Sequence, residues 1–240
     1  DFPAIRGVML ARTTQTNEAG RCATLLPLLA RLTPPLALIE VGASGGLCLL
    51  PDHYGYDYGR VQIAPPTPDA PTLPCAVDAT TTLPSAVPAI IWRAGLDLAP
   101  IDAADPDAAA WLRTLVWPEQ HARAARLDQA LRIAARERPR LVAGDLRRDL
   151  ARLAAEAPPE ATLVIFHTAV LAYVADRAER EAFAADAQRL AAAWISNEAP
   201  TVFPAIAALA SPAPAGRFLL SLNGQPIAWT DPHGTALDAV

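Results

Sequence analysis

The stretch Leu36-Ala37-Leu38-Ile39-Glu40-Val41-Gly42-Ala43-Ser44-Gly45-Gly46 decides the fold that we expect for this chain. It begins with four apolar residues, as a buried strand of a parallel sheet does, and the strand ends near Glu40. The small residues of 42–46 then predict a tight turn in which the backbone can approach a ligand closely. The alternative interpretation is an ordinary tight turn after a strand, since short glycine motifs also occur without a ligand.

The order of acid and small residues in this turn indicates which ligand to expect. The spacing Glu-x-Gly-x-Ser-x-Gly resembles the first motif of S-adenosylmethionine (SAM)-dependent methyltransferases, with Ser44 where the middle glycine usually lies. It fits the phosphate-binding pattern G-x-G-x-x-G less well, because the third glycine of that pattern would fall at Leu47. The candidate cofactor-binding residues of this stretch are Glu40, Gly42, Ser44 and Gly46.

Length and hydropathy limit the architecture. The 240 residues fit one domain over 1–240, with an irregular Pro-rich and Tyr-rich insertion at about 51–88. Apolar residues make up 52% of the chain, which is enough for a sizeable core. The sequence contains no run of 18 apolar residues, so we expect no membrane association.

Charge and cysteine usage exclude several classes of function. All 20 basic residues are arginine, which excludes mechanisms that need a lysine, such as Schiff-base catalysis. The net charge of −5 argues against a general nucleic-acid partner. Cys22, Cys48 and Cys75 are odd in number and form no CxxC pair, so we expect buried thiols, no metal site and a cytoplasmic location.

Apolar strands alternate with amphipathic helices along the chain. This alternation predicts an α/β fold with a doubly wound, mostly parallel, seven-stranded Rossmann-like sheet of the methyltransferase type. The Asn223-Gly224 turn predicts a C-terminal antiparallel hairpin. The expected strands are 36–41, 89–97, 141–145, 162–167, 193–197, 218–222 and 226–230, with short ones at 61–63 and 76–77. The expected helices are 17–32, 107–116, 119–137, 146–155 and 176–192.

Three of the expected strands run into an acidic residue, namely Glu40, Asp97 and Asp145. The carboxyl ends of parallel strands share one edge of a sheet, so these acids should surround one crevice. Carboxylates suit a cationic sulfonium and amine, whereas they would repel a pyrophosphate. Asp97 and Asp145 therefore complete the candidate cofactor-binding set, with a helix N-cap as the alternative role of each acid.

Further residues near this edge are candidates for substrate contact or catalysis. His167 ends the fourth strand and is the candidate general base or substrate orienter, with a satisfied core histidine as the alternative. Arg93 lies in an apolar strand and needs a partner, which is either Asp97 or Asp102 or else a substrate carboxylate. The candidate substrate-binding residues are Asn17, Arg21, Tyr54 and Arg93.

Several motifs are similar to those of a bacterial family known as a domain of unknown function and related to the SAM-methyltransferase superfamily. These motifs are Thr16-Asn17-Glu18-Ala19-Gly20-Arg21, 38–47, Asp52-His53-Tyr54-Gly55-Tyr56, 93–102, Trp111-Leu112 and Val116-Trp117-Pro118-Glu119. The resemblance covers essentially the whole chain and implies a methyltransferase-like fold without naming a substrate. Members usually carry more residues before the first motif, which implies a chain shortened at its N-terminus. They commonly have Asn at the position of Cys48.

The sequence therefore predicts a SAM-dependent methyltransferase that uses SAM as cofactor and acts on a small molecule or a protein side chain. Methyl transfer needs alignment more than a covalent nucleophile, so the lack of lysine does not oppose it. The alternative is a non-catalytic ligand-binding or scaffold protein with a degenerate methyltransferase fold. A nucleotide-dependent oxidoreductase fits the motif spacing and the hairpin less well. The motifs identify neither the acceptor nor an oligomeric state.

Overall fold

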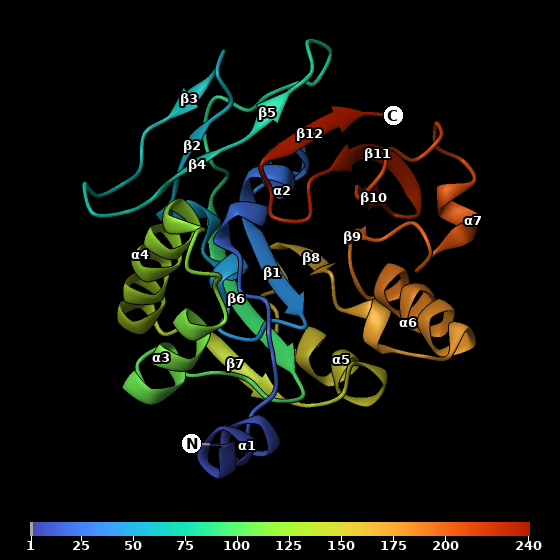
Figure 1. Cartoon of the computed structure of the whole chain (residues 1–240). Coiled ribbons are helices and arrows are strands. Elements are labelled where there is room, and N and C mark those ends of the chain that lie inside the picture. Colours follow the sequence, from blue (N-terminus) through green and yellow to red (C-terminus); the bar gives the residue numbers. More distant parts are fainter. Residues whose placement is uncertain (1) are drawn as a thin grey trace.

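A computed structural model describes residues 2–240 and contains a nine-stranded mixed sheet at its centre (Figure 1). The spatial order of the strands is β5-β12-β11-β10-β9-β8-β1-β6-β7. Their bounds are β1 Leu36–Val41, β5 Ala76–Val77, β6 Ile90–Asp97, β7 Arg140–Ala143, β8 Thr162–Thr168, β9 Ala193–Glu198, β10 Phe218–Leu222, β11 Gln225–Thr230 and β12 Ala236–Ala239.

Five neighbouring strands of this sheet, β7, β6, β1, β8 and β9, are parallel. The chain adds β6 and β7 on one side of β1 and then crosses to add β8 and β9 on the other side. This reversal of direction makes a switch point between β1 and β8, and open α/β sheets bind ligands outside the strand ends at such a point. Val41 lies beside His167 in this register, so the glycine-rich turn after β1 opens at the switch point.

Helices cover both faces of the sheet (Figure 1). On one face, α5 (Leu146–Ala154) and α6 (Arg177–Leu190) pack against apolar side chains such as Ile39 and Trp194. On the other face, α2 (Cys22–Leu29) and α4 (His121–Glu137) bury a larger apolar cluster that includes Leu36 and Leu38. The remaining helices are α1 Phe2–Ala11, α3 Pro106–Thr114 and α7 Pro204–Ala207, with short 3-10 turns η1 Ala19–Arg21, η2 Leu47–Leu49, η3 Pro51–His53 and η4 Leu171–Tyr173.

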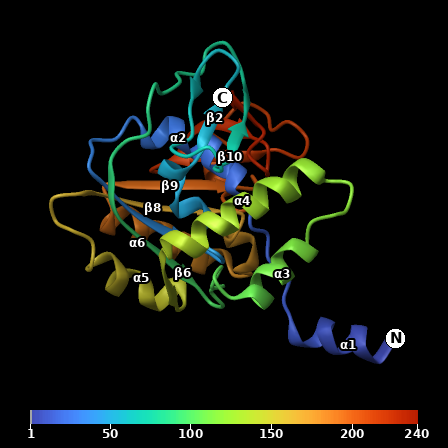
Figure 2. The ribbon, with the colours of Figure 1, turned by 90° about the vertical axis from the view of Figure 1, so that its left-hand side faces the viewer.

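The first helix projects from the body of the protein (Figure 2). An arm over residues 12–17 leads from it to the carboxyl edge of the sheet, where Gln15 donates to the backbone oxygen of Ala99 at 3.1 Å. No helix within residues 2–240 is long and apolar enough to cross a bilayer.

The structure confirms most of the expected elements and corrects the strand count. The sheet has nine strands and not seven, because β12 and β5 extend the edge beyond the hairpin. The hairpin of β10 and β11 is confirmed, with φ values of 50° at Asn223 and 76° at Gly224. The expected helix 17–32 is wrong in extent, because η1 and α2 cover only 19–29.

The 51–88 region is more ordered than its composition suggests. It contains β2 (Gly55–Asp57), β3 (Gln62–Ile63) and β4 (Thr72–Pro74), which form a separate three-stranded sheet. Tyr54, Tyr56 and Tyr58 are buried in the apolar cluster on the face of the main sheet that α2 and α4 cover. Each tyrosine hydroxyl donates to a backbone oxygen there. The tyrosines therefore anchor the insertion to the body of the protein.

Candidate functional site

The turn after β1 is held in a left-handed conformation by its small residues. The φ values are 74° at Gly42, 48° at Ser44 and 69° at Gly46. A Cβ atom on Gly42 would lie 2.3 Å from Cγ2 of Val170, so no larger residue fits there. The first position of the loop 42–46 therefore needs glycine, because both the positive φ and the close packing against Val170 exclude a side chain at Gly42.

Two side chains from other segments fasten this loop. The backbone N–H of Ser44 donates to Oδ2 of Asp97 at 2.8 Å, and that of Gly45 donates to Oδ1 of Asn17 at 2.9 Å. Asn17 also donates through Nδ2 to Oγ of Ser44 at 2.8 Å. The amide of Gly46 donates to the oxygen of Ala43 at 2.7 Å. Because these amides already have protein acceptors, the loop is poorly suited to gripping a pyrophosphate.

Glu40 lies at the carboxyl end of β1 and is 4% exposed. Burial raises the pKa of its carboxyl well above the usual range, and the nearby Cys48 raises it further. Arg21 acts in the opposite direction, but it is the weaker influence. Within residues 2–240, Oε2 of Glu40 has no hydrogen-bond partner. A buried carboxyl oxygen without a partner is uncommon and marks a place where a cationic or hydrogen-bond-donating ligand would be stabilised.

The structure brings two of the three predicted acids together. Asp97 is close enough to Glu40 to raise the pKa of that carboxyl, and both flank the glycine-rich loop. Asp145 instead caps α5, where its side chain accepts from the backbone N–H of Arg147 at 2.9 Å. Hydrogen bonds from the Arg147 side chain and backbone lower the pKa of Asp145 to about 2. The alternative role of a helix N-cap therefore describes Asp145.

Arg93 has a partner that we did not expect. Its Nη1 and Nη2 atoms each lie 2.7 Å from an oxygen of Asp52, and neither Asp97 nor Asp102 pairs with it. Nη1 also donates to the backbone oxygen of Leu49 at 3.0 Å. The expected pairing was wrong because β6 presents Arg93 to the segment after the glycine-rich loop. Within the described chain, its charge is neutralised by Asp52.

The other predicted contact residues serve the core or join segments. Tyr54 is 1% exposed and donates to the oxygen of Leu47 at 2.9 Å, so it supports the segment after the loop. Arg21 is also buried and donates through Nε to the oxygen of Pro232 and through Nη1 to the oxygen of Thr168. It thereby joins the end of β8 to the turn before β12.

His167 is completely buried between the sheet and α6. Its Nε2 accepts from Nε1 of Trp194 at 3.1 Å, which places the ring proton on Nδ1. Nδ1 lies 2.8 Å from Oε1 of Glu198 and donates to it. With both ring nitrogens occupied, His167 matches the alternative role of a satisfied core histidine, and we assign it no part in the site.

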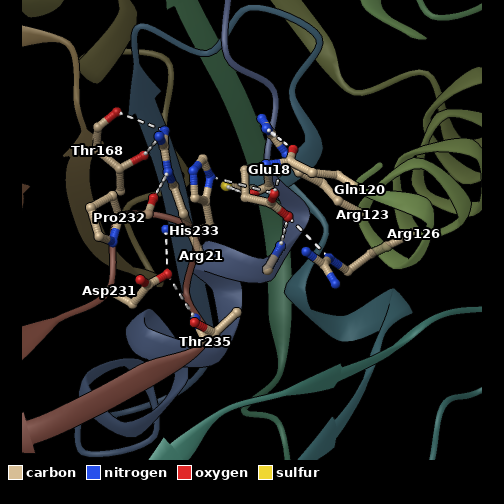
Figure 3. Close-up of polar contacts among 12 residues, drawn as sticks. Glu18, Arg21, Gln120, Arg123, Arg126, Thr168, Asp231, Pro232, His233 and Thr235 are labelled. Carbon is tan, nitrogen blue, oxygen red and sulfur yellow. Dashed lines mark hydrogen bonds and ion pairs between the residues drawn. The ribbon is translucent and has the colours of Figure 1, made fainter. Parts of the chain in front are cut away.

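A second group of polar residues near the loop was missed by the sequence analysis (Figure 3). The buried Glu18 accepts from Nε of Arg123 at 2.9 Å and from Nε of Arg126 at 3.0 Å. His233 approaches from the turn before β12, with its Nδ1 atom 3.7 Å from Oε2 of Glu18. The two arginines follow Glu18 by more than 100 positions, so no local spacing could have indicated the cluster.

A pocket of about 330 Å³ opens beside this cluster. It lies between the arm, the start of α4 and the turn before β12. Its lining residues are Thr14, Gln15, Thr16, Leu115, Trp117, Gln120, Arg123 and His233. Gln15 joins the pocket to the glycine-rich loop, because its side chain hydrogen bonds with Oγ of Ser44. The pocket and the loop are therefore neighbouring parts of one edge of the protein.

One known protein family matches a range of the chain that contains the whole candidate site. Residues 3–238 match the family described as "Uncharacterized protein conserved in bacteria (DUF2332)". No curated protein and no solved structure matches the chain. The family match includes the loop, Glu18 and the lining of the pocket.

Proposed function

We propose that the chain, which belongs to the DUF2332 family of uncharacterized bacterial proteins, binds SAM where β1 and β6 end and transfers its methyl group to a small-molecule or protein acceptor. The observation that carries this proposal is the buried, unpartnered carboxyl oxygen of Glu40 beside the glycine-rich loop. An ionised carboxylate is expensive to bury alone, so a cationic ligand is the partner that would stabilise it. The ammonium group of SAM is such a partner.

The hydrogen bonding of the loop supports this ligand over a dinucleotide. The amides of Ser44 and Gly45 are already used by Asp97 and Asn17, whereas a pyrophosphate would need free donors. Asp97 would attract a cation and repel a phosphate, and Glu40 would do the same once an ammonium group stabilises its ionised form. A small-residue turn at the switch point of a parallel sheet is the place where open α/β sheets commonly bind a ligand.

The residues of this site would act mainly by positioning. SAM, when bound, supplies an activated methyl group, and direct displacement requires alignment of the acceptor with that group. Glu40 would hold the ammonium end of the cofactor. Asp97 and Asn17 would keep the loop in the shape that fits it.

A second candidate is a binding or scaffold protein without turnover, and the arm supports it. Gln15 hydrogen bonds with Oγ of Ser44 and with the oxygen of Ala99, so it bridges the loop and the end of β6. A ligand at this edge would compete with the arm. Replacement of Gln15 by Ala should then tighten SAM binding by about fivefold, the value of one hydrogen bond of about 1 kcal/mol.

The two candidates are separated by thermal shift and turnover measurements. Purified protein is heated with SAM, S-adenosylhomocysteine or NAD in parallel, and ligands that bind the folded state raise the midpoint. A rise with SAM and S-adenosylhomocysteine but not NAD supports the cofactor site. Formation of S-adenosylhomocysteine on addition of a bacterial metabolite extract supports transfer, whereas binding without turnover supports the second candidate. A rise with NAD alone would contradict the SAM site and would favour a nucleotide-dependent oxidoreductase.

A further inference from the structure

Arginine side chains lie at and behind the lining of the pocket beside the Glu18 cluster. Arg123 and Arg126 share the single carboxylate of Glu18, whereas Arg21 donates to backbone oxygens and to Thr168 and its charge acts on Glu40. Asp231 lies on the His233 side, where its Oδ1 atom accepts from the backbone N–H of His233. The charge of the Arg123 and Arg126 pair therefore exceeds that of its directly bound carboxylate by one.

Arg123 is the member of this cluster that also lines the pocket. Its Nε atom is bound to Glu18 and its Nη1 atom to Oε1 of Gln120 at 2.9 Å. Within residues 2–240, no second carboxylate lies within 4.0 Å of its side chain. The guanidinium is thus fixed in position and has binding capacity left toward the pocket, as in sites that recognise carboxylate or phosphate groups.

The start of α4 adds to this potential. The helix has 17 residues, no acidic residue in its first turn and no capping side chain at Gln120. The positive end of its dipole lies where Gln120 and Arg123 line the pocket. The dipole strengthens the effect of Arg123 on a negatively charged group.

The rest of the lining fits an organic molecule. His233 is half-buried, and burial followed by the charge of Arg123 lowers its pKa, which favours the neutral imidazole. Thr14 and Thr16 offer hydroxyl groups, whereas the amide of Gln15 is bound to Ala99 and Ser44. Trp117 and Leu115 provide an apolar side, and Trp117 is 71% exposed. A volume of about 330 Å³ matches a small ligand and not a polymer.

We propose that this pocket binds a small organic anion, with its carboxylate or phosphate group on Arg123 and its apolar part against Trp117. The chain's net charge of −5 opposes a polyanion such as nucleic acid. The proposal that the pocket binds an anion does not depend on the proposed SAM site. The use of the pocket by the methyl acceptor rests on the proposed function, since Gln15 connects the pocket to Ser44.

Isothermal titration with phenyl phosphate and with benzoate, in low-salt buffer without SAM, tests the proposal. Arg123→Gln should weaken binding about tenfold or more, because it removes a charged hydrogen-bond donor. Arg126→Gln is the matched control, since it also removes one bond to Glu18 but does not line the pocket. It should change the affinity by no more than about threefold, as expected for a screened charge outside the pocket.

A third variant keeps the test valid if the arginine variants unfold. Thr16 is exposed, so Thr16→Trp should fill the pocket without disturbing an ion pair and should abolish binding. Binding of phenyl phosphate alone, of benzoate alone or of both probes supports the proposal and shows whether the pocket takes a phosphate, a carboxylate or either group. Equal weakening in both arginine variants, or no saturable binding of either probe at about 10 mM, would overturn the proposal. SAM binding measured on the same samples shows whether the cofactor site fails separately.

Discussion

The carboxylate of Asp97 accepts a hydrogen bond from the backbone N–H of Ser44 at 2.8 Å and thereby ties the end of β6 to the turn after β1. Its second oxygen accepts from the amide of Ala99 at 2.8 Å. A single side chain thus fixes the loops that follow two neighbouring strands. This explains why an acid is needed at the end of β6 whether or not a ligand is bound.

Replacement of Asp97 by Ala should weaken binding of S-adenosylhomocysteine by about 1–3 kcal/mol, because the loop loses a charged acceptor. Titration calorimetry on the folded variant measures the change. Asp102→Ala is the control, since Asp102 is exposed and accepts only from the nearby amide of Ala104. A folded Asp97 variant with unchanged affinity would remove this residue from the site.

Replacement of Asn17 by Ala should lower the free energy of unfolding by about 1–3 kcal/mol. The change leaves the buried amide of Gly45 without its acceptor and removes the donor to Ser44. Urea denaturation measures the loss, and Thr16→Ala at the adjacent exposed position is the control. Equal stability of the two variants would show that Asn17 does not hold the loop.

Arg93 and Asp52 should stabilise the fold as a pair without affecting the cofactor. Arg93→Met should lower the free energy of unfolding by about 1–3 kcal/mol, since it removes two close donors from a partly buried carboxylate. A double-mutant cycle with Asp52→Asn isolates the coupling between the two side chains. A coupling energy near zero, or a loss of S-adenosylhomocysteine binding, would support the earlier hypothesis of a substrate contact.

Glu40 should make stability depend on pH. The pKa of Glu40 is raised in the folded protein. At pH values above the ordinary pKa of a glutamate, the folded state therefore binds more protons than the unfolded state. The free energy of unfolding should therefore fall as pH rises from 5 to 8, and Glu40→Gln should reduce this fall. Urea denaturation at both pH values tests the effect, with the exposed Glu160→Gln as control. Parallel pH profiles for the wild type and Glu40→Gln would contradict it.

The sequence predicted the parts of the fold that depend on local patterns. The strand Leu36–Val41 was correct to the residue, because a continuous apolar run ends in a turn that only small residues can form. The Asn223-Gly224 hairpin was equally clear, since both residues adopt positive φ. The strands β2 and β4 were missed because they contain Gly55 and Pro74, residues that are typical of turns and loops.

The contacts within the site depend on packing between distant segments and were predicted less well. Arg93 lies 41 residues from Asp52, and Glu18 lies more than 100 residues from Arg123. An acid after a strand can also serve as a helix cap, and only the structure separates Asp145, which caps α5, from Asp97, which holds the loop. Glu40 stood out in the sequence, but its unpartnered oxygen could not be inferred.

Titration calorimetry of S-adenosylhomocysteine against the wild type and Glu40→Gln at pH 7.5 tests the central claim most directly. We predict saturable binding to the wild type and an affinity at least about tenfold lower for the folded variant, because the charged acceptor for the ammonium group is lost. Absence of binding to the wild type at about 1 mM ligand, or equal affinity of the two proteins, would contradict the assignment of this edge as a SAM site.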